Sequence, residues 1–179
     1  MVLALDISTT CTGWAVFSKE GTYVKSGFIK LNKIKDFYEK CKKVQDALFK
    51  LVLLYSIDLV VVEENLQAFR PGLSSAKTLM TLARFNGIIR WMCHADIKCS
   101  VLTYNVNSDR KAVGLKIDRK SAKTTKEQVL EWVTPQVDIS WPTKVLKSGP
   151  NKGKIRLCDE SYDMADAFVV GKAHFLLKN

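Results

Sequence analysis

The sequence predicts one α/β domain built on a five-stranded mixed sheet that is flanked by helices. Residues 1–6 (MVLALD) and 58–64 (DLVVVEE) are short apolar runs that end in acids, as expected of strands buried on both faces. Longer segments between and after them repeat apolar residues every three or four positions, which is typical of amphipathic helices. With 179 residues and 47% hydrophobic content, the chain can bury one substantial core but not two ordinary ones.

The first 105 residues of the chain contain all five predicted strands. After the turn at STTCTG, the runs GWAVF and TYVKSGFIKL predict two strands that form an antiparallel meander with the first. An amphipathic helix should begin near Ile34, a fourth strand ends at residues 63–64, a long helix covers 75–94, and KCSVLTYN is the fifth strand. Right-handed crossovers would make the two later strands parallel to the first. This β-β-β-α-β-α-β order is that of the RNase H-like fold.

The second half is predicted to be mostly helical. A helix should cover 125–133, and another should cover about 161–177. Between them, TKVLKSGPNKGKIRL has the Gly/Pro turn of a basic hairpin, at about 141–157. We therefore expect residues 1–179 to form a single domain that carries this hairpin as an insertion.

Positive charge is concentrated in one part of the chain. The formal net charge is +10, and residues 107–156 hold twelve Lys and Arg against five Asp and Glu. Such a field attracts a polyanion to one face and gains affinity by releasing counterions, which favours nucleic acid as the partner. A basic surface that only keeps the protein soluble is the alternative.

The sequence argues against several other classes of protein. It lacks the ~20 uninterrupted apolar residues of a membrane helix and the pattern of a signal peptide, so we expect a soluble, intracellular protein without membrane contact. Its five cysteines are scattered and odd in number, which fits buried reduced thiols better than disulfides or structural zinc.

A sparse set of acids marks the candidate catalytic site. Asp6 ends the first strand, Glu63 and Glu64 end the fourth, and Asp163 and Asp166 share one face of the last helix. Any one of them could be an ordinary exposed acid at a strand end or a helix start. Together they match what Mg²⁺ requires for two-metal phosphodiester hydrolysis, namely a few carboxylates on separate elements.

Five motifs, in order along the chain, resemble those of RuvC-type Holliday junction resolvases. They are LALDISTTCTGWAVF, LVVVEENL, KTLMTLARFNG, TKEQV and YDMADAF. The resemblance implies an RNase H-like, Mg²⁺-dependent endodeoxyribonuclease, with Mn²⁺ able to substitute and two ions per active site. Such an enzyme acts in DNA recombination and repair as a homodimer that nicks four-way DNA junctions symmetrically.

The same resemblance assigns roles to individual residues. Asp6, Glu63, Asp163 and Asp166 would bind the metal ions, and Lys126 would approach the scissile phosphate or the backbone beside it. Because neighbouring side chains of a strand point to opposite faces, at most one of the two glutamates joins Asp6. Val61 shares a face with Glu63 and Val62 shares one with Glu64; both are apolar, so burial does not distinguish the glutamates, whereas the family pattern selects Glu63.

The chain departs from the family pattern in two places. Family members often carry a Phe three residues after the strand Glu, where it stacks on junction bases; here Leu66 stands at that position and Phe69 lies three residues further on. The basic segment 144–156 also looks like an insertion. The sequence leaves open which residue replaces the stacking Phe.

Two further features allow two interpretations each. The helix at 75–94 has apolar residues on two faces, so it is either deeply buried or shared with a partner, and the resemblance favours a dimer interface. Trp132 and Trp141 lie among basic residues and would either stack on exposed bases or pack in the core.

Other functions remain compatible with parts of the sequence. Another RNase H-fold nuclease, which cuts RNA–DNA hybrids or flaps, would use the same acids. DISTTCTG also resembles the phosphate loop of actin-like ATPases, although 179 residues leave no room for their second half. A non-catalytic junction-binding module is the third alternative, and the retained acids argue against it because they repel phosphate.

Overall fold

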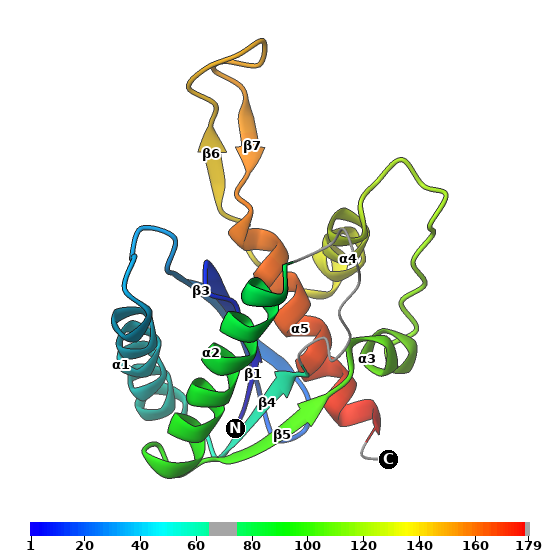
Figure 1. The fold of residues 1–179 in the computed structure, drawn as a ribbon. Helices are drawn as coiled ribbons and strands as arrows, with labels where there is room; N and C mark the ends of the chain where they lie inside the picture. The colour runs from blue at the N-terminus through cyan, green and yellow to red at the C-terminus, as the bar shows by residue number, and fades with distance from the viewer. Residues whose placement is uncertain (65–74, 178–179) are drawn as a thin grey trace.

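The computed structural model describes residues 1–64 and 75–177, and its centre is a five-stranded sheet in the order β3-β2-β1-β4-β5 (Figure 1). The antiparallel meander consists of β1 (Val2–Asp6), β2 (Cys11–Phe17) and β3 (Tyr23–Lys30). Parallel to β1 run β4 (Leu59–Glu63) and then β5 (Ser100–Tyr104). The mixed RNase H-like sheet that the sequence predicts is therefore confirmed.

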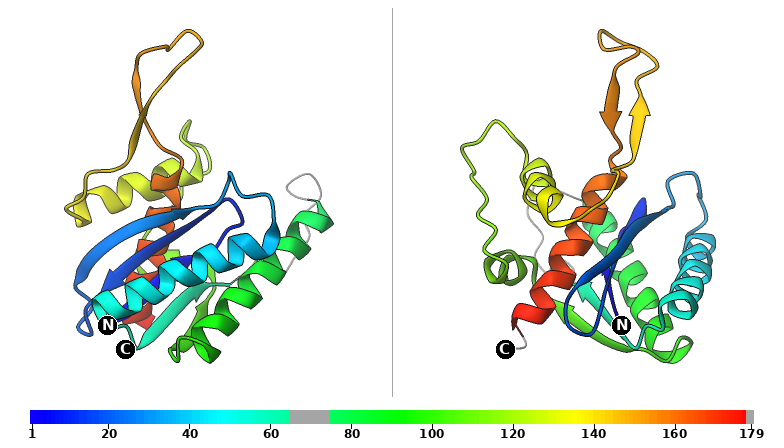
Figure 2. Two further views of the ribbon diagram at one scale, coloured as in Figure 1. Left: turned by 90° about the vertical axis from the view of Figure 1, so that its left-hand side faces the viewer. Right: turned by 180° about the vertical axis from the view of Figure 1, so that it is seen from behind.

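Helices cover both faces of this sheet (Figures 1 and 2). One face carries α1 (Phe37–Tyr55) and α2 (Ala76–Ala95), and the other carries α4 (Thr125–Val133) and α5 (Glu160–Leu177). In β1, Leu3 and Leu5 pack into the first core cluster, whereas Val2 and Ala4 pack into the second. Burial on both faces explains why the strand is apolar throughout.

Side-chain caps set where the helices begin. The carboxylate of Asp36 accepts a 2.9 Å hydrogen bond from the Glu39 N–H, so α1 starts at Phe37 rather than at Ile34 as predicted. At α4, Thr124 and Glu127 form a reciprocal capping box. No helix within 1–64 and 75–177 combines the length and apolarity needed to cross a membrane. All five cysteines are free, and four of them are buried.

One helix was not predicted from the sequence. It is α3 (Val106–Ala112), which follows β5 and packs beside α5. Its cap is Asn105, whose side-chain oxygen accepts a hydrogen bond from the Asn107 N–H at 3.0 Å. Seven residues make only two turns, too few to display an apolar period. A 3₁₀ turn, η1 (Thr134–Gln136), follows α4 and was likewise not predicted.

The basic stretch before α5 forms an antiparallel hairpin of β6 (Thr143–Val145) and β7 (Ile155–Leu157). Figures 1 and 2 show that it projects away from the sheet. Strand alternation places Lys144 and Arg156 on one of its faces and the exposed Val145 and Ile155 on the other. At its base, Trp141 packs against the second core cluster, as Trp132 of α4 also does, and both side chains are partly buried there.

Two glycines allow α5 to lie directly on the sheet. A Cβ atom at Gly13 of β2 would overlap the backbone carbonyl of Asp163, and a Cβ at Gly171 of α5 would overlap the ring of Phe17. The close approach of α5 to the sheet therefore requires glycine at both positions. It determines how far the acidic first turns of α5 stand from the ends of β1 and β4.

We predict that Gly13→Ala lowers the free energy of unfolding by roughly 1–3 kcal/mol, because the added methyl group meets backbone atoms that cannot rotate away. Denaturant titration measures the loss. The matched control is Gly87→Ala in α2, where nothing lies within 4 Å of the added Cβ and helix propensity should raise stability by up to about 1 kcal/mol. Equal stability of Gly13→Ala and the unsubstituted chain would contradict the prediction.

Candidate active site

Two of the predicted acids end neighbouring parallel strands. In the β1–β4 ladder Leu5 is opposite Val62, and the next residues along the two strands are Asp6 and Glu63. Parallel strands end at the same edge of a sheet, so the two carboxylates share one edge. Both side chains are only partly exposed.

The other two acids reach this edge from α5. Asp163 and Asp166 lie one turn apart near the start of the helix, on the side that packs against the sheet. Gly13 connects the two groups, because it pairs with Asp6 in the β1–β2 ladder and contacts the backbone of Asp163. The structure thus places all four predicted acids at the same edge of the sheet, where the charges of Glu63, Asp163 and Asp166 act on Asp6.

These carboxyl groups hold their protons more tightly than exposed ones do. Burial first, and then the charges of Asp166, Glu63 and Asp163, raise the pKa of Asp6 well above its usual value. Burial and the charge of Asp166 raise the pKa of Glu63 to about 7. Burial likewise raises the pKa of Asp166 to about 6, and it raises that of Asp163. Each group would ionise more readily if a cation were present.

Two basic side chains face the acids. The Nζ atom of Lys126, the second residue of α4, lies 3.3 Å from an oxygen of Asp163. A guanidinium nitrogen of Arg110 lies 3.8 Å from an oxygen of Asp166. Burial lowers the pKa of Lys126, but the charges of Asp163 and Asp166 outweigh that effect and raise it overall. Arg110 was not predicted as a site residue, and only its place in the basic segment pointed to it.

The arrangement is short of positive charge. Within the described residues, the ion pairs set two cations against four partly buried carboxylates. In the same part of the chain, no three His, Cys, Asp or Glu side chains are already close enough together to hold a metal ion as they stand. A set of oxygen ligands short of positive charge is what a hard divalent cation prefers.

A fifth acid lies beside the site. Asp109 of α3 is fully buried, and neither of its carboxylate oxygens has a hydrogen-bond partner among the described residues. Burial raises its pKa to about 7, although Arg110 opposes the effect, and its charge contributes to the raised pKa values of Glu63 and Tyr104. Nothing in the sequence distinguished Asp109 from the other charges of the basic segment.

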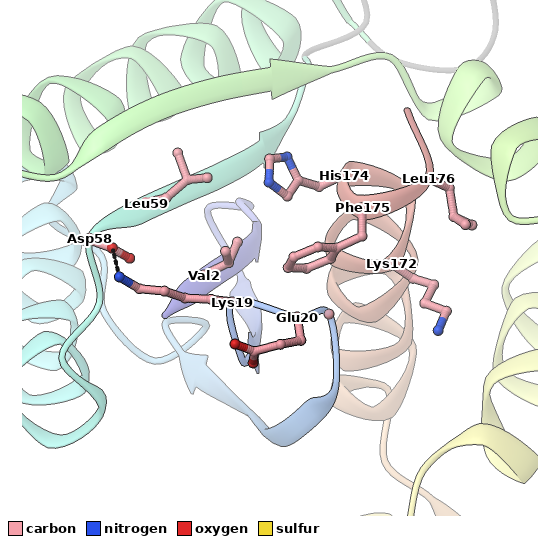
Figure 3. Close-up of a pocket in the computed structure, with 10 residues that line it drawn as sticks. Val2, Lys19, Glu20, Asp58, Leu59, Lys172, His174, Phe175 and Leu176 are labelled. Carbon is pink, nitrogen blue, oxygen red and sulfur yellow. Dashed lines mark ion pairs between the residues drawn. The ribbon is translucent and has the colours of Figure 1, made fainter. Parts of the chain in front are cut away.

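The other predicted residues are not part of this group of acids. Glu64 follows the end of β4, where its N–H donates a 2.7 Å hydrogen bond to the Tyr104 carbonyl. Leu66 and Phe69, the two candidates for a base-stacking residue, lie outside the described residues. The cleft in Figure 3 is a separate feature, since it is lined by Val2, Lys19 and Phe175 among others and lies at the opposite end of β1 from Asp6.

We predict that Asp166→Asn raises the melting temperature at pH 7.5 in EDTA by a few °C. A carboxyl whose folded pKa is raised destabilises the fold as pH rises through the interval between its unfolded and folded pKa values, here from about 4 to about 6. In a chain of this size, about 1 kcal/mol corresponds to roughly 2–4 °C. The gain should shrink steeply towards pH 4 and vanish near pH 3, below both pKa values, where the carboxyl is largely protonated in both states.

The matched control is Asp138→Asn, which neutralises an exposed acid and should leave the melting temperature unchanged at both pH values. Thermal unfolding followed by circular dichroism measures all four conditions. A lower melting temperature for Asp166→Asn at pH 7.5 would show that Arg110 and Lys126 already compensate this acid fully.

Comparison with known proteins identifies the fold. No family model matches the chain. The crossover junction endodeoxyribonuclease RuvC of Rickettsia prowazekii is 26% identical over 95 residues, which cover 48% of this chain and 60% of that protein. The match therefore spans less than two thirds of that relative.

Solved structures match over almost the whole chain. Thermus thermophilus RuvC in complex with a Holliday junction substrate superposes with a TM-score of 0.66 at 13% identity, covering 99% of this chain and 93% of that one. Another structure of T. thermophilus RuvC gives 0.63 at 15% identity, covering 99% and 94%. The yeast mitochondrial Holliday junction resolvase Ydc2 gives 0.55 at 14% identity, covering 99% and 79%. The chain therefore has the RNase H-like fold of the RuvC-type resolvases.

Proposed function

We propose that this chain is a metal-dependent endonuclease that cuts four-way DNA junctions. The observation that carries the proposal is the convergence of four carboxylates from β1, β4 and α5 at one sheet edge, in a fold shared with RuvC. A structural protein has no use for this cluster, because each buried carboxylate raises the cost of ionising the others.

Asp6, Glu63, Asp163 and Asp166 would hold Mg²⁺, with Mn²⁺ able to substitute and two ions per site. Their oxygen atoms are the ligand type that hard divalent cations bind. Bound ions would supply an activated water and stabilise the leaving oxygen of the phosphodiester. The raised pKa values of Glu63 and Asp166 support this assignment, because burial disfavours their charged forms and Arg110 and Lys126 offset that effect only in part.

Lys126 and Arg110 would bind the phosphate that is cut. Each reaches one acid of α5 from outside the sheet, Lys126 from α4 and Arg110 from α3. Metal ions on the carboxylates would weaken these two ion pairs and leave both cations available to phosphate oxygens. We infer that they orient the scissile phosphate and help to neutralise it.

Branched DNA is the proposed partner, and the β6–β7 hairpin would contact one of its arms. Three of its lysines, Lys147, Lys152 and Lys154, are exposed, and within the described residues none of them has an acidic partner. A projecting cationic hairpin gains affinity by releasing the counterions of DNA. We further infer that residues 1–179 form one nuclease domain into which this hairpin is inserted.

A homodimer formed through α2 is the proposed assembly. Met80 and Trp91 lie three turns apart on the outer face of α2, and they are 66% and 61% exposed. Large apolar side chains on the solvent side of a helix are typical of a protein interface. A two-fold dimer would place one active site on each of two opposed strands.

A panel of substrates tests the function. The enzyme should cut a synthetic four-way junction with Mg²⁺ and leave it intact in EDTA. Linear duplex, flap and RNA–DNA hybrid substrates of the same sequence are the alternatives. Preferred cleavage of the hybrid or the flap would assign the chain to a different group of RNase H-fold nucleases and overturn the proposal.

We predict that Glu63→Gln reduces Mg²⁺-dependent junction cleavage by at least about 100-fold, while junction binding in EDTA persists. Removing one ligand charge weakens metal binding by several kcal/mol, and each 1.4 kcal/mol is about a factor of ten in rate. Glu64→Gln is the matched control and should cut at a near-normal rate. If Glu64→Gln is inactive and Glu63→Gln is active, the catalytic glutamate is the second of the pair.

We predict that Trp91→Glu gives a monomer at micromolar concentration, because it places a charge in the proposed interface. Ile88 is a poorer choice, since it packs partly against the core. Leu53→Glu, on α1, is the control: Leu53 is 81% exposed and lies outside the proposed interface. Sedimentation velocity distinguishes the species. An unsubstituted protein that stays monomeric even with junction bound would exclude this dimer.

A further inference from the structure

A basic cleft lies beside the carboxylates, between α3 and the start of α4. Its volume is about 630 Å³, and its lining consists of Asn107, Arg110, Lys111, Gly114, Leu115, Lys116, Ile117, Arg119 and Thr125. Four of these residues are cations and none is an acid. The loop that joins α3 to α4 forms one wall, and Figure 1 shows this loop running out from α3 and back to α4.

Most of the cations in the cleft are not neutralised by the protein. Lys111, Lys116 and Arg119 are exposed, and within 1–64 and 75–177 none of them forms an ion pair. Basic residues nearby differ in this respect, since Lys123 pairs with Glu131 at 2.6 Å and Lys144 pairs with Asp159 at 3.2 Å. A concave surface with several unpaired cations attracts an anion with more than one charge.

The cleft is continuous with the candidate active site. Arg110 belongs to both, because it lines the cleft and its guanidinium group lies 3.8 Å from Asp166. Thr125 lines the cleft, and the next residue, Lys126, contacts Asp163. A chain of phosphate groups that passes the four acids would therefore enter the cleft directly.

We propose that this cleft binds the sugar–phosphate backbone of the strand being cut, on one side of the scissile phosphate. This inference rests on the proposed nuclease function. The guanidinium group of Arg119 can hold a phosphate through two parallel hydrogen bonds, while Lys111 and Lys116 act as mobile point charges. Contacts to phosphates position a strand without reading its sequence.

The cleft and the hairpin then have different tasks. The hairpin projects away from the sheet edge (Figures 1 and 2), so its lysines would contact a duplex arm away from the cut. The cleft would contact the phosphates next to the cut. Removing charge at either place should weaken binding to the junction. It should also reduce the slope of log affinity against log salt concentration by about one for each phosphate contact that is lost. Only the contacts made by the cleft should depend on the charge of individual phosphates beside the cut.

The test combines protein variants with neutral phosphates. Four-way junctions are made with one methylphosphonate, an uncharged linkage, at each of the phosphates that flank the cut in turn. We would compare three proteins. They are the unsubstituted chain, the cleft variant Lys116→Gln/Arg119→Gln, and the hairpin control Lys147→Gln/Lys152→Gln, which removes the same number of charges. Affinity is measured by fluorescence anisotropy in EDTA, and the rate of cleavage is measured with Mg²⁺ at saturating enzyme.

For the unsubstituted chain and the hairpin control, we expect neutral linkages on one side of the cut to weaken binding severalfold. For the cleft variant, the same linkages should have little further effect, because the contact they remove is already absent. Lys111→Gln, on the opposite wall of the cleft, should show a smaller loss of the same kind. Equal sensitivity of the cleft variant and the unsubstituted chain at every position would overturn the proposal.

Failure of the nuclease proposal gives a different result. A protein that binds the junction but does not cut it with Mg²⁺ contradicts the proposed function, while the anisotropy series in EDTA still reports whether the cleft contacts those phosphates. A protein that cuts the junction with unchanged sensitivity in the cleft variant contradicts the cleft assignment alone.

Discussion

The close packing of α5 on β1 and β2 is the constraint on which the rest of the structure depends. Glycine at 13 and at 171 removes the side chains that would separate helix and sheet, so backbone meets backbone and the ring of Phe17. The consequence reaches beyond stability. Asp163 and Asp166 are on the helix, whereas Asp6 and Glu63 are on the sheet, and the distance between the two pairs is set by how closely the two layers pack. A tight core contact therefore fixes the geometry of a polar site at its edge.

The proposed function places two opposite electrostatic demands on the site. Its acids would have to share cations, and burial first, followed by the charges of neighbouring carboxylates, raises their pKa values. The surrounding surface would have to attract a polyanion, which a cluster of acids repels. Partly buried acids beside exposed, unpaired basic side chains would meet both demands. Arg110 and Lys126 lie at the boundary between these two regions, each facing one acid of α5.

Much of this arrangement could be predicted from sequence patterns that reflect local physics. A strand that is buried on both faces must be apolar throughout, which identified β1 and β4, and their parallel pairing made Asp6 and Glu63 neighbours. What could not be predicted depends on tertiary packing. Asp109 and Arg110 are adjacent charges in a basic stretch, yet α3 buries one completely and turns the other toward Asp166. No local pattern distinguishes them, because α3 is too short to show which of its faces is inside. The contacts of Gly13 and Gly171 could not be predicted either, because they join residues that are far apart in the chain.

The base of the hairpin is connected directly to the first turn of α5. Only Cys158 and Asp159 separate β7 from the first residue of α5, and the carbonyl of Pro142 accepts hydrogen bonds from the N–H of Cys158 at 2.8 Å and from the hydroxyl of Ser161 at 3.3 Å. The residues that flank both strands of the hairpin are thereby connected to the first turn of the helix, by a linker of only two residues on one side and by hydrogen bonds on the other. A displacement of the base of the hairpin would therefore also move the first turn of α5, the helix that carries two of the four acids.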